Sequence, residues 1–193
     1  MTDAIFFFQT LPLLCLNLFL AVSGKMWYIF FVINKCTGRY QMTFSHSQIN
    51  AYPAISLHDH RATHLDAAEN RLAFTFDGGF TLTPQISPDL QNSCKNSGRA
   101  ALVFHDAEAE FYIHREHRIF GISFLITRKN YSLKKLAEKL CSGSWELEFI
   151  GEYHGYNSVF YTCCIWQKHK PYHIDCQLDI YCENIEYLWN DTI

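Results

Sequence analysis

The stretch YHIDCQLDIYC, residues 172–182, contains the most regular alternation of apolar and polar side chains in the chain. Apolar residues at even positions from Ile174 to Ile180 alternate with polar ones, a period of two that is typical of a β-strand with one buried and one solvated face. Strands of this kind belong to antiparallel sheets. The stretch therefore predicts an antiparallel sheet with an apolar core on one side.

Similar patterns predict further strands on both sides of this stretch. The run Ile119–Thr127 is apolar on both faces, which predicts a central strand covered on both sides. The charged run His114–Arg118 is interpreted as a turn, and Thr83–Gly98 as a long loop. The other predicted strands are Arg61–Asp66, Arg71–Asp77, Ala100–Phe104, Glu110–His114, Trp145–Phe149 and Asn157–Lys168.

One amphipathic helix is expected after Ser132, a residue type that favours the N-cap position. Apolar residues recur at helical spacing from Leu133 to Leu140, and Gly143 stands where a left-handed terminal residue is expected. A helix this short must pack its leucine stripe against the sheet. The expected fold class is therefore α+β, a mostly antiparallel sheet of about eight strands with one packed helix.

The composition of the chain fits a folded domain. Hydrophobic residues make up 49% of the 193 residues and aromatic residues 16%, unlike a disordered chain. Residues 1–41 contribute +2 to the formal net charge of −3, which leaves −5 on the rest. An acidic domain without a Lys/Arg block is a poor nucleic-acid binder, because neutralised phosphates dominate that affinity. The eight cysteines are interpreted as mostly buried, reduced thiols, with adjacent Cys163 and Cys164 facing opposite sides of a strand.

Residues 1–41 form an apolar extension, and a single globular domain is expected over residues 42–193. Ala4–Gly24 has no charged side chain and is long enough to cross a hydrocarbon core of about 30 Å. The basic residues after it would then hold the domain on the cytoplasmic side. A secretory signal peptide is a second interpretation, and a translation start at Met42 is a third. Contact with a membrane is expected only if residues 4–33 belong to the protein, and a cytoplasmic location is expected in either non-secreted case.

Three histidines form the candidate metal site of the sequence. His58, His60 and His64 share one parity, so on a strand they would face one side and could hold Zn²⁺ with an open position. The alternative is a solvated face with loop histidines, since no further ligand stands at a standard spacing. The cluster supports a metal-dependent enzyme as an alternative function, and no other cofactor is expected.

An acidic face beside aromatic residues is the candidate partner site. Net negative charge steers encounters with a basic protein. Paired carboxylates could also serve as acid and base, but the sequence has no GxSxG, HExxH or phosphate-loop motif. The candidate partner-binding residues are Glu146, Glu148, Glu152, Tyr153, Tyr156, Asp175 and Asp179.

Several short motifs resemble those of small bacterial β-rich proteins of unknown function. These motifs are LHDxR at 57–61, FDGGF at 76–80, WELEF at 145–149, EYxxYN at 152–157 and YxWN at 187–190. Some proteins of this kind are regarded as toxin-immunity or accessory proteins, so the resemblance implies an immunity-like role and brings no catalytic residue. The expected function is a non-catalytic, acidic protein-binding domain with a basic partner. The alternatives are the metal-dependent enzyme and a membrane-tethered domain.

Overall fold

The computed structural model describes residues 43–68, 70–86, 93–119 and 122–192, and the expectations for residues 1–41 lie outside these ranges. The described residues form fourteen strands in three sheets, with antiparallel pairing throughout, and one short helix. The expected α+β fold of about eight strands is therefore wrong. The described part of the chain is a mostly antiparallel β protein.

Short strands account for much of the difference. Five strands are only two to four residues long, too short for a periodic pattern to identify them. In addition, the predicted strand Arg61–Asp66 is divided at Thr63 into two strands that belong to different sheets. Such strands exist because neighbouring strands offer them hydrogen-bond partners, which the local sequence does not reveal.

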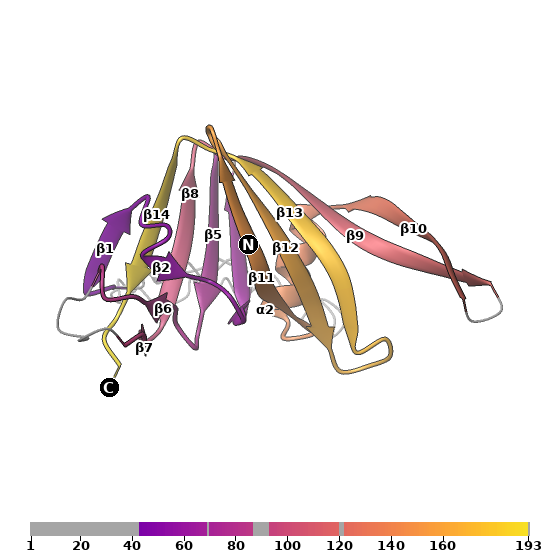
Figure 1. The fold of residues 1–193 in the computed structure, drawn as a ribbon, viewed down its shortest axis with the longest axis horizontal. Helices are drawn as coiled ribbons and strands as arrows, with labels where there is room; N and C mark the ends of the chain where they lie inside the picture. Colours follow the sequence, from indigo (N-terminus) through magenta and orange to yellow (C-terminus); the bar gives the residue numbers. More distant parts are fainter. Residues whose placement is uncertain (1–42, 69, 87–92, 120–121, 193) are drawn as a thin grey trace, which may run out of the picture. The chain divides into compact units, whose positions relative to one another are not determined.

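Two large sheets and one small sheet contain all of these strands (Figure 1). The five-stranded sheet has the order β1 (His46–Ile49), β14 (Asn184–Trp189), β8 (Ala100–His105), β5 (Arg71–Phe76) and β4 (His64–Ala68). The six-stranded sheet has the order β10 (Ile122–Tyr131), β9 (Glu108–Ile119), β13 (His173–Tyr181), β12 (Ser158–Gln167), β11 (Trp145–Gly155) and β3 (His60–Ala62). The small sheet has the order β2 (Ile55–Ser56), β6 (Thr81–Leu82) and β7 (Lys95–Asn96).

The core lies between the two large sheets and is rich in aromatic side chains. Phe74 of β5 packs edge-on against Phe149 of β11, with ring centroids 5.6 Å apart. Phe104 of β8 meets Tyr161 of β12 in the same way, at 6.2 Å. All four side chains are buried. These pairs join strands of different sheets, so aromatic burial holds the sheets together.

Three connections gather at one end of the sheets (Figure 1). The β11–β12 turn lies there, beside the links from β8 to β9 and from β13 to β14, which carry the chain from one large sheet to the other. Asn157 and Asp106 adopt positive φ angles in two of these turns, a conformation that Asn and Asp tolerate better than most residues.

The predicted helix is confirmed as α2 (Leu133–Cys141), with Ser132 at the N-cap position. Leu136 and Leu140 are buried, and the helix packs mainly on β4 and on β11. Gly143 has the expected positive φ of 66°. The predicted strand at residues 172–182 is also confirmed, as β13.

The region around β9 and β10 differs from the sequence-based expectation. No turn occurs at His114–Arg118, because β9 continues through it to Ile119. Of the predicted central strand Ile119–Thr127, Ile119 ends β9 and Ile122–Thr127 belongs to β10. β10 lies at the edge of its sheet and pairs only with β9 among the described residues. Ile126 is accordingly 67% exposed. Beyond Ile113, β9 has left β13, so the two strands continue as a two-stranded ribbon.

Both members of the adjacent cysteine pair are buried, so the expectation of one outward thiol is wrong. Cys163 and Cys164 are 2% and 5% exposed. Burial raises the pKa of Cys164 to about 11, which keeps this thiol protonated. Cys164 therefore behaves as a small apolar side chain.

Candidate functional site

A bulge in β11 determines where the acidic residues of this strand point. The ladder between β11 and β12 pairs Phe149 with Cys163 and then Gly151 with Thr162, which leaves Ile150 without a partner. An extra residue of this kind reverses the inside–outside parity of every later side chain. Glu152 therefore lies on the same inner face as Phe149, although their spacing predicts opposite faces.

Neighbouring backbone and side-chain groups hold the bulge in place. His58 donates a hydrogen bond from Nδ1 to the carbonyl of Ile150 at 2.5 Å, and the backbone N–H of Asp59 donates to the carbonyl of Phe149 at 2.8 Å. At Gly151, an added Cβ would lie 2.5 Å from the hydroxyl oxygen of Thr162, so the close approach of the strands favours glycine there.

The Glu152 side chain is only 10% exposed, and three donors converge on one of its oxygens. Oε1 accepts hydrogen bonds from the hydroxyls of Tyr161 and Tyr187 at 3.2 and 3.3 Å and from Nε2 of His154 at 2.7 Å. Both tyrosines are fully buried. Burial, reinforced by the nearby Glu152 charge, raises the pKa of each tyrosine. The two hydroxyls therefore stay protonated and serve as fixed donors.

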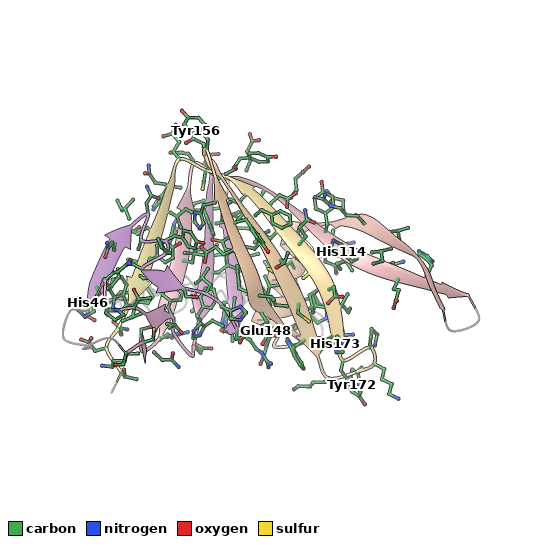
Figure 2. The ribbon with its side chains drawn as sticks, in the orientation of Figure 1. His46, His114, Glu148, Tyr156, Tyr172 and His173 are labelled. Atoms are coloured by element: carbon green, nitrogen blue, oxygen red, sulfur yellow. The ribbon has the colours of Figure 1, made fainter. Side chains whose placement is uncertain are left out.

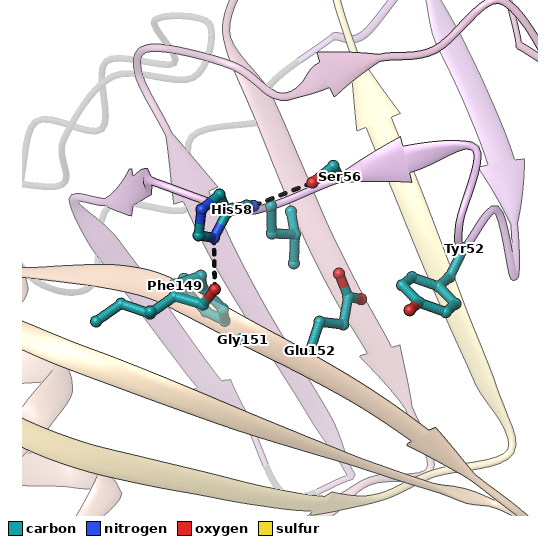
Figure 3. A pocket seen from close by; sticks show the side chains of 8 residues that line it. Tyr52, Ser56, His58, Phe149, Gly151 and Glu152 are labelled. Atoms are coloured by element: carbon teal, nitrogen blue, oxygen red, sulfur yellow. Dashed lines mark hydrogen bonds between the residues drawn. The ribbon is translucent and has the colours of Figure 1, made fainter.

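A pocket of about 170 Å³ opens beside this carboxylate (Figure 3). Tyr52 lies beside Glu152 in the pocket, and its ring stacks on that of His154 with centroids 4.0 Å apart. Oε2 of Glu152 accepts no hydrogen bond from the described residues. The pocket is lined by Tyr52, Ser56, Leu57, His58, Phe149, Ile150, Gly151 and Glu152.

The three candidate zinc ligands have separate surroundings. Asp59 adopts a positive φ of 62°, so residues 58–64 do not form one regular strand, and His60 and His64 lie in strands of different sheets. His60 is hydrogen-bonded to Thr81, while His64 is exposed. Partial burial lowers the pKa of His60, an effect that outweighs the opposing influence of Asp59. Across the described ranges, no three His, Cys, Asp or Glu side chains are grouped so that they could hold a metal ion.

Two of the candidate partner-binding carboxylates share one arginine. Arg61 donates from Nη1 to Glu146 at 3.3 Å and from Nε to Glu148 at 3.1 Å. The guanidinium also stacks over the ring of Trp166 at 4.2 Å, and the indole N–H donates to Glu148 at 2.5 Å. Each carboxylate therefore has an ion-pair partner within the domain, and the single guanidinium balances one of the two negative charges.

The remaining candidate partner residues fall into two groups. Asp179 pairs with Arg128 at 2.6 Å, so its charge is also compensated. Asp175 is exposed on β13. Tyr153 and Tyr156, near and in the β11–β12 turn, are 61% and 94% exposed. The sequence analysis places all of the candidate partner residues on one face. In the structure, some of them are buried, some are ion-paired and some are exposed.

Sequence reasoning missed three tyrosines of the Glu152 site. Tyr52, Tyr161 and Tyr187 come from distant parts of the chain and meet only after the sheets assemble. The sequence offers one signal for this site, a glutamate at position 152 close to a histidine at position 154. Only the bulge at Ile150 turns Glu152 toward the tyrosines.

Among the described residues, no helix combines the length and the apolar character needed to cross a membrane. Comparisons of the chain with protein-family models, curated proteins and solved structures gave no match.

Proposed function

We propose that this domain is a non-catalytic, immunity-like protein-binding domain that uses an acidic, tyrosine-rich surface to bind a basic partner. This surface, the tyrosine tip, lies at the end of the sheets where the three connections gather, with Tyr156 at its apex (Figure 2). Its members are Tyr153, Tyr156, Tyr181, Asp106, Glu108 and Glu183.

The observation that carries the proposal is the exposure of three tyrosines together. Tyr156 is 94% exposed, and Tyr153 and Tyr181 are 61% and 58% exposed. Tyr181 pairs with Ser158 on one side and with Glu108 on the other, so the tip is continuous across three strands. Tyrosine is enriched among the residues that dominate the energy of protein interfaces, because its burial removes a large apolar area while its hydroxyl still bonds.

The charge of the tip favours a basic partner. Asp106, Glu108 and Glu183 are exposed, and none forms an ion pair with the residues described. Glu146, Glu148 and Asp179 differ in this respect, because each of them forms an ion pair with an arginine. Free negative charge raises the rate of encounter with a positively charged protein.

A cytoplasmic location forms part of the proposal. Cys163, Cys164, Cys176 and Cys182 are all buried, which supports thiols acting as core residues in a reducing compartment.

The test uses the full chain as bait in a lysate of its native source. The captured partner is identified by mass spectrometry, purified, and titrated against variants. The double variant Tyr156→Ala/Tyr181→Ala should weaken binding by about 30-fold or more, since a central interface residue contributes about 2 kcal/mol or more. Tyr172→Ala is the matched control, because Tyr172 is 54% exposed at the other end of the sheets (Figure 2).

Two results would overturn the proposal. The first is a partner that binds the double variant with unchanged affinity. The second is an equal loss of affinity in Tyr172→Ala, which would show that the tip has no special role. Binding should also weaken as salt is raised, because screening shortens the reach of exposed charges.

A further inference from the structure

We infer that the pocket beside Glu152 binds an organic cation, a guanidinium or primary ammonium group, through Oε2 of Glu152 and the ring of Tyr52. This site goes beyond the proposed protein-binding role and can be tested without any partner. The pocket lies between the segment of residues 52–58 and strand β11 (Figure 3).

The two oxygens of the Glu152 carboxylate have different surroundings. Its three hydrogen bonds all reach Oε1, so Oε1 is fully used inside the protein. Oε2 has no donor from the described residues. Because no buried side-chain oxygen among them lacks a hydrogen-bond partner, Oε2 is open to solvent, although the whole side chain is only 10% exposed. A carboxylate oxygen in such surroundings gains from a charged donor, because hydrogen bonds to ionised groups are roughly twice as strong as neutral ones.

The lining of the pocket suits a positively charged ligand. Tyr52 supplies an aromatic wall, and aromatic faces attract cations within about 6 Å of the ring centroid. A negatively charged ligand would be repelled by the Glu152 carboxylate.

The size of the pocket suits a small ligand. Pockets for drug-sized ligands measure about 300–1,000 Å³, whereas this one measures about 170 Å³. The volume therefore suits the head group of a side chain or a small free cation, and it is too small for an organic cofactor.

The experiment titrates the ¹⁵N-labelled full chain with methylguanidinium and with methylammonium, followed by amide chemical shifts. N-methylurea serves as the neutral ligand of matching shape. Saturable shifts at Tyr52, Leu57 and Gly151 are expected with the cations and not with the urea. Shifts that fail to saturate, or that are the same with the urea, would overturn the inference.

Glu152→Gln provides the decisive variant. Its amide oxygen still accepts from the two tyrosines, but the negative charge is lost, so affinity for methylguanidinium should fall about tenfold or more. Glu148→Gln is the matched control on the same strand and should leave the affinity unchanged. Unchanged affinity in a folded Glu152→Gln variant would contradict the inference.

A second variant covers the case in which Glu152→Gln does not fold. Tyr52 is 43% exposed, so Tyr52→Ala should fold and should lower the affinity about two- to fivefold through loss of the aromatic wall. Unchanged affinity in this variant would then overturn the inference. The double variant Tyr156→Ala/Tyr181→Ala should bind the cations normally, which separates this test from that of the tyrosine tip.

A peptide arm identifies the source of the cation. An acetylated and amidated Gly-Arg-Gly peptide that binds more tightly than methylguanidinium would point to an arginine side chain of a partner. A weaker peptide would point to a free small cation. In both cases, the Glu152→Gln variant should bind the cation no more tightly than it binds N-methylurea.

Discussion

Both halves of β11 contain glutamates, but the glutamates of the two halves lie in different surroundings. Before Ile150, Glu146 and Glu148 face Arg61 on the outer side of the sheet, 48% and 15% exposed. After Ile150, Glu152 lies on the inner side between two buried tyrosines. One unpaired residue in the ladder separates two ion-paired surface carboxylates from a buried carboxylate beside a pocket.

The comparison shows why acidic residues cannot be assigned to one surface from their spacing. A bulge changes parity without changing composition, and bulges recur where a side chain must be aimed at a particular place. The energetic demands on the two halves also differ, because a buried polar group must be satisfied while an exposed one can rely on water.

The largest expected difference between the two halves is in stability. Glu152→Ala leaves the hydroxyls of Tyr161 and Tyr187 buried without their acceptor, which should lower the free energy of unfolding by about 2–4 kcal/mol. Glu146→Ala removes only an exposed ion pair and should change it by about 0.5 kcal/mol or less. Urea unfolding of both variants measures the contrast, and equal losses would contradict the buried network.

Glu148→Ala should fall between these two. Glu148 accepts from the indole of Trp166 and from Arg61, but Arg61 keeps Glu146 as a partner. We expect a loss of about 1–2 kcal/mol in the free energy of unfolding. A double-mutant cycle with Trp166→Phe isolates the indole hydrogen bond, and additive effects would show that this bond contributes nothing.

Deletion of Ile150 tests the bulge itself. Because Ile150 has no partner in the ladder, removing it leaves the pairs Phe149–Cys163 and Gly151–Thr162 in register, with Glu152 still inside. The main loss is the hydrogen bond from His58, about 1 kcal/mol in the free energy of unfolding. Deletion of Tyr153, inside the regular ladder, should unfold the domain. Thermal unfolding of the two deletion variants measures the contrast, and equal damage from both would disprove the register described for β11.

The smallest effect concerns pH and the strand on the other side of β11. His60 pairs with Phe149, and its pKa in the folded domain is lowered from 6.5, chiefly by burial. The unfolded chain therefore binds more protons as the pH falls below 6.5, so this contribution to stability is present above 6.5 and is lost toward lower pH. Urea unfolding from pH 8 to pH 5 should show a shallower decline in His60→Gln than in the natural chain. Identical profiles would exclude His60 as a source of the dependence.

Several elements could be predicted because their signals are local. The alternation from Ile174 to Ile180 identified β13, and the leucine spacing after Ser132 identified α2. The interpretation of His114–Arg118 as a turn was wrong, because a charged run suits a turn or an exposed ribbon, and only the pairing of β9 with β10 distinguishes them. The short strands were missed for the same reason, since their partners are distant in sequence.

The amino-acid pattern was sufficient to show a β-rich acidic domain with one helix, because burial imposes a period of two on strands and of 3.6 on helices. It was insufficient to show that Glu152 is buried while Glu146 and Glu148 are paired at the surface. That outcome depends on cross-strand hydrogen bonds around Ile150 and on tyrosines 9 and 35 residues away from Glu152. Such contacts form only when the sheets pack, so they produce no periodic pattern of residue types in the sequence.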